Sequence, residues 1–209
     1  MKLYNDATSP FGRKTIVCAI ERRIPVEEVF LDLNKAEFLD KWNPLRQIPT
    51  LVTSDDIVVY DSDVIVQFLD KRHDHSSLIP EADAPGVLTR MSRANGLMEA
   101  TLTRLIETRR AEGQRDTNVI SKLEARIWRV IGSIEQDLEQ LTVTGDQLRA
   151  DQVTTAVAMG YVNFRFTEAW HEKHKALSRW YSGIASRRSM ALTVPSRTTP
   201  VPLAEVTRK

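Results

Sequence analysis

The chain has 209 residues, a formal net charge of +1, 42% apolar residues and 27% charged residues. This composition is typical of a soluble globular protein. The balanced charge argues against a dedicated nucleic-acid-binding protein, which would carry a strong basic excess. A chain of this length can bury a sizeable core without disulfides or structural metal. Its single cysteine, Cys18, rules out an intrachain disulfide and fits a reducing compartment.

Export, membrane insertion and metal binding find no support in the sequence. The first residues, MKLYNDATSP, lack the long apolar run of a signal peptide, and no stretch approaches the roughly 18 apolar residues of a membrane span. The histidines do not combine with the cysteine in any metal-ligand spacing. We therefore expect a cytoplasmic protein without a membrane partner, a nucleic-acid partner or a bound metal ion.

The N-terminal part of the chain alternates short apolar runs with helical patterns. Residues 2–4 predict a strand, residues 13–23 a helix that ends before Pro25, and residues 26–31 a second strand. A helix between two such strands is the usual crossover of a parallel βαβ unit. The sequence therefore predicts that the first two strands are parallel neighbours.

A hairpin and another helix follow. Residues 35–42 indicate a short helix or turn, and the apolar runs 50–53 and 57–60 are separated by three polar residues, as in a tight hairpin. Asp61 and Ser62 then supply a helix start. The predicted order is β-α-β-α-β-β-α, a small mixed sheet covered by helices.

The rest of the chain is helical in pattern. We predict a first domain at 1–76, a polar, proline-containing linker at 77–85 and an all-helical domain at 86–209. Apolar spacing predicts helices at 87–105, 120–141, 151–166 and 176–184, and an irregular tail from residue 193.

Four stretches, in this order, resemble the cytosolic glutathione transferases: MKLYNDATSPFGRK at 1–14, NPLRQIPTLV at 43–52, YDSDVIVQFLD at 60–70 and LRADQVTTAVAMGY at 148–161. The resemblance implies an α/β, thioredoxin-like N-terminal domain that holds glutathione, followed by an all-α helical bundle domain. It also implies a cytoplasmic homodimer with a detoxification role, which conjugates the glutathione thiolate to a small, apolar electrophile.

In the resembled family, the proline that corresponds to Pro49 follows a cis peptide bond. That arrangement would offer the backbone of Ile48 to an extended tripeptide by strand pairing. Gln47, beside it, would meet the glycyl carboxylate of glutathione, and Arg46 is a weaker candidate for this role. The alternative is a trans proline that simply opens a strand.

Asp61 and Ser62 would bind the γ-glutamyl end of glutathione, according to the same resemblance. A helix N-terminus presents free N–H groups and a partial positive charge, which suits a carboxylate. The family more often has Glu at the position of Asp61. Asp and Ser are also ordinary helix N-caps, and a capping role and a ligand-binding role would use the same geometry.

Ser9 is the catalytic candidate, because the SPFGRK stretch aligns it with the family's catalytic serine. Its hydroxyl would donate a hydrogen bond to the glutathione sulfur and favour the thiolate. The alternative is an N-cap of the helix that begins at Pro10, and Thr8 is the nearest rival for the catalytic role. Cys18 lies well inside that helix, which indicates a buried packing residue rather than a redox centre.

The electrophile would bind between the two domains. Candidate pocket residues are Phe11, Leu102, Leu105, Ile106 and Arg109, although each of them is also an ordinary core or surface residue. Asp151 differs from the family's helix-capping pattern, because Leu148 stands where a Ser or Thr would complete the reciprocal cap. We therefore assign Asp151 a role in folding.

Two other functions are compatible with these residues. One is a glutathione transferase-like interaction module with little catalysis. The other is a glutathione-dependent isomerase, whose usual SSCxWR-like start is replaced here by Pro10 and the residues after it.

Overall fold

The computed structural model describes residues 1–72, 77–166 and 168–195. The chain divides into two compact units, one formed by Met1–Glu81 together with the residues from Arg188 onward, the other by Ala82–Arg187. In the described part of the chain, no helix combines the length and the apolar content that a membrane crossing requires.

The first unit contains a four-stranded mixed sheet in the order β2-β1-β3-β4. Its strands are β1 (Lys2–Asn5), β2 (Glu27–Phe30), β3 (Thr50–Val52) and β4 (Val58–Val59). β1 pairs with β2 in parallel and with β3 antiparallel, and β4 pairs antiparallel with β3. The predicted βαβ unit and hairpin are therefore confirmed.

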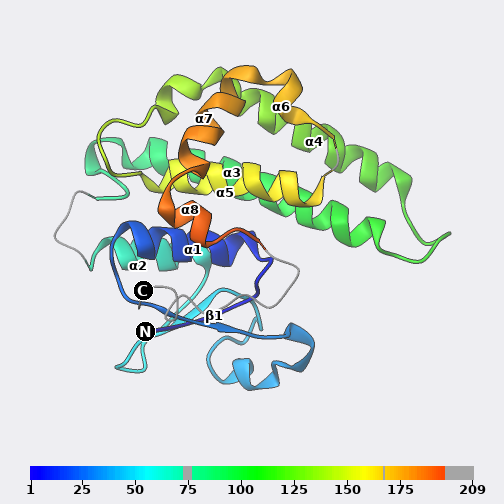
Figure 1. The fold of residues 1–209 in the computed structure, drawn as a ribbon. Coiled ribbons are helices and arrows are strands. Elements are labelled where there is room, and N and C mark those ends of the chain that lie inside the picture. Colours follow the sequence, from blue (N-terminus) through cyan, green and yellow to red (C-terminus); the bar gives the residue numbers. More distant parts are fainter. Residues whose placement is uncertain (73–76, 167, 196–209) are drawn as a thin grey trace. The chain divides into compact units, whose positions relative to one another are not determined.

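Neighbouring residues of β1 serve opposite faces of the sheet, because strand side chains alternate. Leu3 belongs to the core beneath α1 (Pro10–Glu21) and α2 (Ser62–Asp70), which lie together on one face (Figure 1). Tyr4 packs instead with Leu39 and stacks on Trp42, with 4.9 Å between the ring centroids.

The segment that covers Tyr4 consists of two short 3-10 helices rather than a regular helix. They are η1 (Leu33–Lys35) and η2 (Glu37–Lys41), in the region predicted as a short helix or turn. Tyr4 is thereby fixed in the core, as its place in a strand predicts.

The last described helix, α8 (Arg188–Leu192), packs against α1. The buried Arg13 side chain donates to the carbonyl oxygen of Met190 (3.0 Å) and to Oγ1 of Thr193 (3.3 Å). These contacts group α8 with the first unit, although it follows the helical region in sequence. The domain boundaries 1–76, 77–85 and 86–209 stay a prediction, and most of the predicted irregular tail lies outside the described residues.

The second unit is helical and is organised around α3 (Ala84–Thr108), which packs along both α4 (Thr117–Gln136) and α5 (Ala150–Arg165) (Figure 1). The four helices predicted from the apolar spacing are confirmed, except that the one predicted to run to residue 141 ends at Gln136 and is followed by a separate 3-10 helix. The remaining helical elements are η3 (Glu81–Asp83), which precedes α3, and η4 (Leu138–Leu141), α6 (Trp170–Lys173) and α7 (Lys175–Ala185). α6 and α8 were missed because so few residues carry no readable helical period.

The N-terminus of α5 is fastened by a buried charge network. The fully buried Asp151 accepts hydrogen bonds from Nε of Arg90 (2.6 Å) and Nε of Arg149 (3.1 Å). Arg90 also donates to Asp83 (2.6 Å), while Oε1 of Gln152 accepts from the backbone N–H of Arg149 (2.7 Å). Asp151 thus joins α5 to α3.

Candidate glutathione site

The sheet register brings three candidate segments to one edge of the first unit. Tyr4, near the C-terminal end of β1, pairs with Thr50 at the start of β3, and Leu51 pairs with Val59 at the end of β4. The segment leading to Ser9, the turn before Thr50 and the segment leading to α2 therefore leave the sheet at the same end of its strands. Residues 6–9, 47–49 and 61–62 converge there because of this register.

Ser9 is the N-cap of α1. It has an extended backbone, and its Oγ accepts a hydrogen bond from the N–H of Gly12 (3.2 Å). The structural interpretation of Ser9 is therefore confirmed. Because the hydroxyl acts there as an acceptor, its proton is not used, and within the described residues Ser9 donates to no side chain. A hydroxyl that accepts in this way can cap the helix and donate its proton to a ligand at the same time.

Thr8 differs from Ser9 in where its hydroxyl proton goes. Oγ1 of Thr8 donates to Oδ1 of Asp6 (2.7 Å), and the Thr8 N–H donates to the same oxygen (2.7 Å). A hydroxyl has one proton to donate. The Thr8 proton is therefore engaged within the loop, which favours Ser9 over Thr8 as the donor to a sulfur.

The turn before β3 contains a cis peptide bond between Ile48 and Pro49, as the resemblance implies. The bond between Tyr60 and Asp61 is cis as well. Over the described ranges, neither the N–H nor the C=O of Ile48 has a hydrogen-bond partner within the protein. These two groups are the donor and acceptor that an extended peptide would need for strand pairing.

Asn43 holds this turn in shape, and sequence analysis missed it. Its side chain is buried; Nδ2 donates to the carbonyl oxygen of Gln47 (3.1 Å) and to Oγ1 of Thr50 (3.0 Å), and Oδ1 accepts from the N–H of Leu45 (3.0 Å). The only available signal was the Asn-Pro pair, which indicates a turn but not its internal bonds.

Asp61 and Ser62 begin α2. Oδ1 of Asp61 caps the helix by accepting from the N–H groups of Asp63 (3.0 Å) and Val64 (3.3 Å). Ser62 occupies the first helical position and is largely buried; in the described part of the chain, neither its hydroxyl nor its N–H has a protein partner. Ser62 can therefore offer two donors to a carboxylate, and Asp61 a negative charge to an amine.

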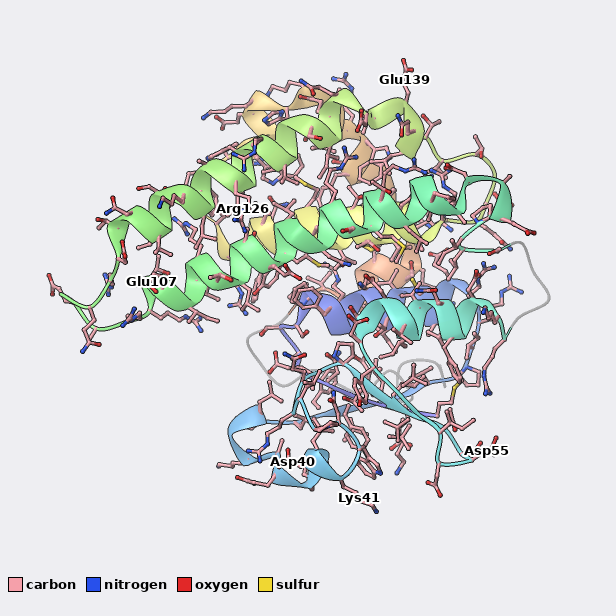
Figure 2. All side chains as sticks on the ribbon, turned by 180° about the vertical axis from the view of Figure 1, so that it is seen from behind. Asp40, Lys41, Asp55, Glu107, Arg126 and Glu139 are labelled. Atoms are coloured by element: carbon pink, nitrogen blue, oxygen red, sulfur yellow. The ribbon has the colours of Figure 1, made fainter. Side chains whose placement is uncertain are left out.

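The two polar residues of the turn differ in availability. Arg46, whose φ is 48°, makes a bidentate ion pair with Asp40. Asp40 lies on η2 (Figure 2). The hydrogen bond from Arg46 lowers the pKa of the Asp40 carboxyl. Gln47 is exposed, and among the described residues its side chain has no partner. Gln47 is thus the better placed of the two to receive a ligand.

Gly12 packs closely against the end of β1. A Cβ added to Gly12 would lie 1.6 Å from Oδ1 of Asn5, whose side chain is buried and donates to Glu28 (2.8 Å). Gly12→Ala should therefore lower the free energy of unfolding by about 1–3 kcal/mol, because the buried Asn5 side chain would have to move and its hydrogen bond to Glu28 would be disturbed. Urea denaturation measures this.

Gly96 is the matched control for that substitution. A Cβ at Gly96, within α3, meets no atom within 4 Å. Gly96→Ala should stabilise the protein by up to about 1 kcal/mol, as expected for alanine in a helix. Equal effects of the two substitutions would contradict the close packing at Gly12.

Cys18 is fully buried, and this burial raises the pKa of its thiol to about 12. The prediction of a packing cysteine is confirmed. We expect the native protein to react with a colourless aromatic disulfide reagent only after unfolding, at neutral pH, because the thiolate is the reactive form. Rapid labelling of the native protein would contradict this assignment.

The predicted pocket residues are distributed over both units. Phe11 lies in α1, whereas Leu102, Leu105, Ile106 and Arg109 follow one another along α3 and its C-terminal end. Leu102 and Leu105 are partly buried, and Ile106 is 57% exposed. The pocket itself stays a prediction. Over the described residues, no group of three or more His, Cys, Asp or Glu side chains forms a metal site.

Comparison with known proteins agrees with this geometry. The family model for the N-terminal domain of glutathione S-transferases matches residues 8–72. A glutathione S-transferase of Methylobacillus flagellatus, solved with glutathione bound, is 32% identical, with 93% of this chain and 99% of that chain covered and a TM-score of 0.88. The chain belongs to the glutathione S-transferase family.

Two other relatives are similar over nearly their whole length. A glutathione transferase family member of Pseudomonas fluorescens Pf-5 with bound glutathione is 29% identical, covers 93% of this chain and 98% of its own, and gives a TM-score of 0.87. Its complex with S-(propanoic acid)-glutathione gives a TM-score of 0.84. The uncharacterized GST-like protein YibF of Escherichia coli K12 is 27% identical, with 94% of this chain and 100% of YibF covered.

Proposed function

We propose that the protein binds glutathione at the end of the sheet in the first unit and conjugates it, through its thiolate sulfur, to an electrophilic carbon of a small, apolar molecule. The observation that carries the proposal is that the N–H and C=O of Ile48 have no protein partner among the described residues, in a turn that leaves the sheet at the same end as the segment leading to Ser9. Close relatives have been solved with glutathione bound.

In this proposal, each part of glutathione meets a different group. The cysteinyl backbone pairs with Ile48 ahead of Pro49, and Gln47 meets the glycyl carboxylate. The γ-glutamyl carboxylate accepts hydrogen bonds from Ser62 at the start of α2, and Asp61 attracts the neighbouring ammonium group. The ligand's sulfur would then lie over the start of α1.

The Ser9 hydroxyl donates a hydrogen bond to that sulfur. A free thiol has a pKa of about 8.5, so stabilisation of the anion increases the nucleophilic form at neutral pH. The thiolate forms a sulfur–carbon bond with the electrophile, while the leaving group departs with its bonding electrons. A relative has been solved with bound S-(propanoic acid)-glutathione, a glutathione whose sulfur carries a carbon substituent, and this supports chemistry of this type.

The experiment has two arms, glutathione retention and turnover. The purified protein should be retained on immobilised glutathione, be eluted by free glutathione, and convert chlorodinitrobenzene with release of chloride. Retention without turnover of any electrophile would contradict the catalytic part of the proposal and favour an interaction module. Failure of both would contradict the glutathione site itself.

We also propose that the protein is a cytoplasmic homodimer. Phe38, on the η2 side of the first unit, is 48% exposed beside Trp42, an apolar surface that a second copy would cover. Light scattering after gel filtration should give twice the mass of the chain, and Phe38→Glu should shift the protein to monomer.

A further inference from the structure

A buried lysine lies between the two helices that carry the proposed glutathione-binding groups. The side chain of Lys14, on α1, has no exposed surface, yet it carries a charged ammonium group. That group makes an ion pair with the carboxylate of Asp63 in the first turn of α2. A buried charge of this kind persists only where it is paired.

Asp63 in turn contacts the start of the proposed site. Its backbone N–H donates to Oδ1 of Asp61 (3.0 Å), and it directly follows Ser62 in the chain. A continuous path therefore runs from the helix that begins at Ser9, through Lys14 and Asp63, to the residues that would hold the γ-glutamyl group. The helix that positions the sulfur donor and the helix start that receives the carboxylate are fastened to each other by this pair.

The pair also affects the charge at the helix start. An unneutralised carboxylate at Asp63 would repel the carboxylate of a ligand bound at Ser62 and reduce the positive potential of the helix N-terminus. Lys14 supplies the compensating charge from within the protein, so that Asp61 alone acts on the ligand's ammonium group.

We propose that Lys14 is a positioning residue for glutathione: through its ion pair with Asp63, it fixes the first turn of α2 in the position and charge state that bind the γ-glutamyl group. This inference rests on the proposed function, because it deepens the same site. Lys14 does not touch the ligand, and its effect should fall on glutathione affinity rather than on the reaction of bound glutathione.

A second ion pair between the same two helices provides a matched control. Arg22 donates to Asp70 (2.8 Å), and both side chains are nearly buried. This pair joins the C-terminal ends of α1 and α2, away from Ser62. Arg22→Met therefore removes a buried cation between the same helices without affecting the proposed site.

The experiment compares Lys14→Met, Asp63→Asn, their combination and Arg22→Met in the full chain. Calorimetric glutathione affinity, the KM for glutathione and kcat at saturation are measured, with thermal unfolding as a check on folding. Lys14→Met and Asp63→Asn should each weaken glutathione binding about tenfold and raise KM in parallel, with kcat within about twofold. The double variant should bind glutathione no more weakly than the weaker-binding single variant, because the two substitutions remove the same ion pair.

Three outcomes would overturn the inference. One is unchanged glutathione affinity in folded Lys14→Met and Asp63→Asn proteins. Another is an equal loss of affinity in Arg22→Met, which would mean that the Lys14 pair contributes only to stability. A loss confined to kcat would also contradict it. The unsubstituted protein is measured in parallel. If it binds no glutathione, the proposed function fails, and this inference fails with it.

Discussion

Ser9→Ala is expected to lower kcat at least tenfold and up to about a thousandfold, the cost of losing one donor to a reacting anion. The Oγ of Ser9 accepts from Gly12, which leaves its proton for the glutathione sulfur. Glutathione affinity should change little, because Ile48, Asp61 and Ser62 hold the rest of the tripeptide. Steady-state kinetics with chlorodinitrobenzene, together with calorimetric binding, separate the two effects.

Two variants control for the helix cap and for the rival hydroxyl. Ser9→Ala also removes an N-cap, at a cost of about 0.5–2 kcal/mol in stability, so kcat is compared well below the unfolding temperature. Ser9→Thr retains both the cap and the hydroxyl and should keep most of the activity. Thr8→Ala should leave kcat within about twofold, because the Thr8 proton is bound to Asp6. A large loss in Thr8→Ala with none in Ser9→Ala would transfer the catalytic role to Thr8.

Asp151→Asn should lower the free energy of unfolding by about 3–5 kcal/mol, the usual cost of breaking a buried ion pair from one side. Asp151 has no exposed surface, and it neutralises Arg90, whose side chain is only 9% exposed. Burial lowers the pKa of the Arg90 guanidinium, but hydrogen bonds to Asp151 and Asp83 outweigh that effect and leave the pKa raised. Urea denaturation followed by circular dichroism measures the loss.

Asp83 is the matched control, because it pairs with the same arginine from the surface. Its side chain is 56% exposed. Asp83→Asn should therefore cost no more than about 1 kcal/mol, as for other exposed pairs. Similar losses in the two variants would show that burial of Asp151 is not what makes its charge necessary.

The regular elements were predictable because their residues carry a period. The run 50–53, the hairpin turn after it and the apolar steps of the long helices were each readable from neighbouring residues, and the structure confirms β3, β4, α3 and α4. The order of the four motifs then indicated the family. Local pattern and motif order together were sufficient for the fold.

The polar contacts that shape the proposed site were not predictable in the same way. Asn43, Lys14 and Arg13 are polar residues that become buried, and burial of a polar side chain leaves no periodic signal. The partners of Lys14 and Arg13 are also distant in sequence: Lys14 and Asp63 are 49 positions apart, and Arg13 and Met190 are 177 apart. Only the folded chain shows which charges meet.

A crystal structure of the protein grown with glutathione would show whether the backbone of Ile48 holds the ligand. We expect the cysteinyl N–H and C=O of glutathione to pair with the backbone of Ile48, the γ-glutamyl carboxylate to lie at Ser62, and the sulfur to accept a hydrogen bond from Ser9. Glutathione bound with its backbone away from Ile48, or with its sulfur directed away from the start of α1, would contradict this expectation.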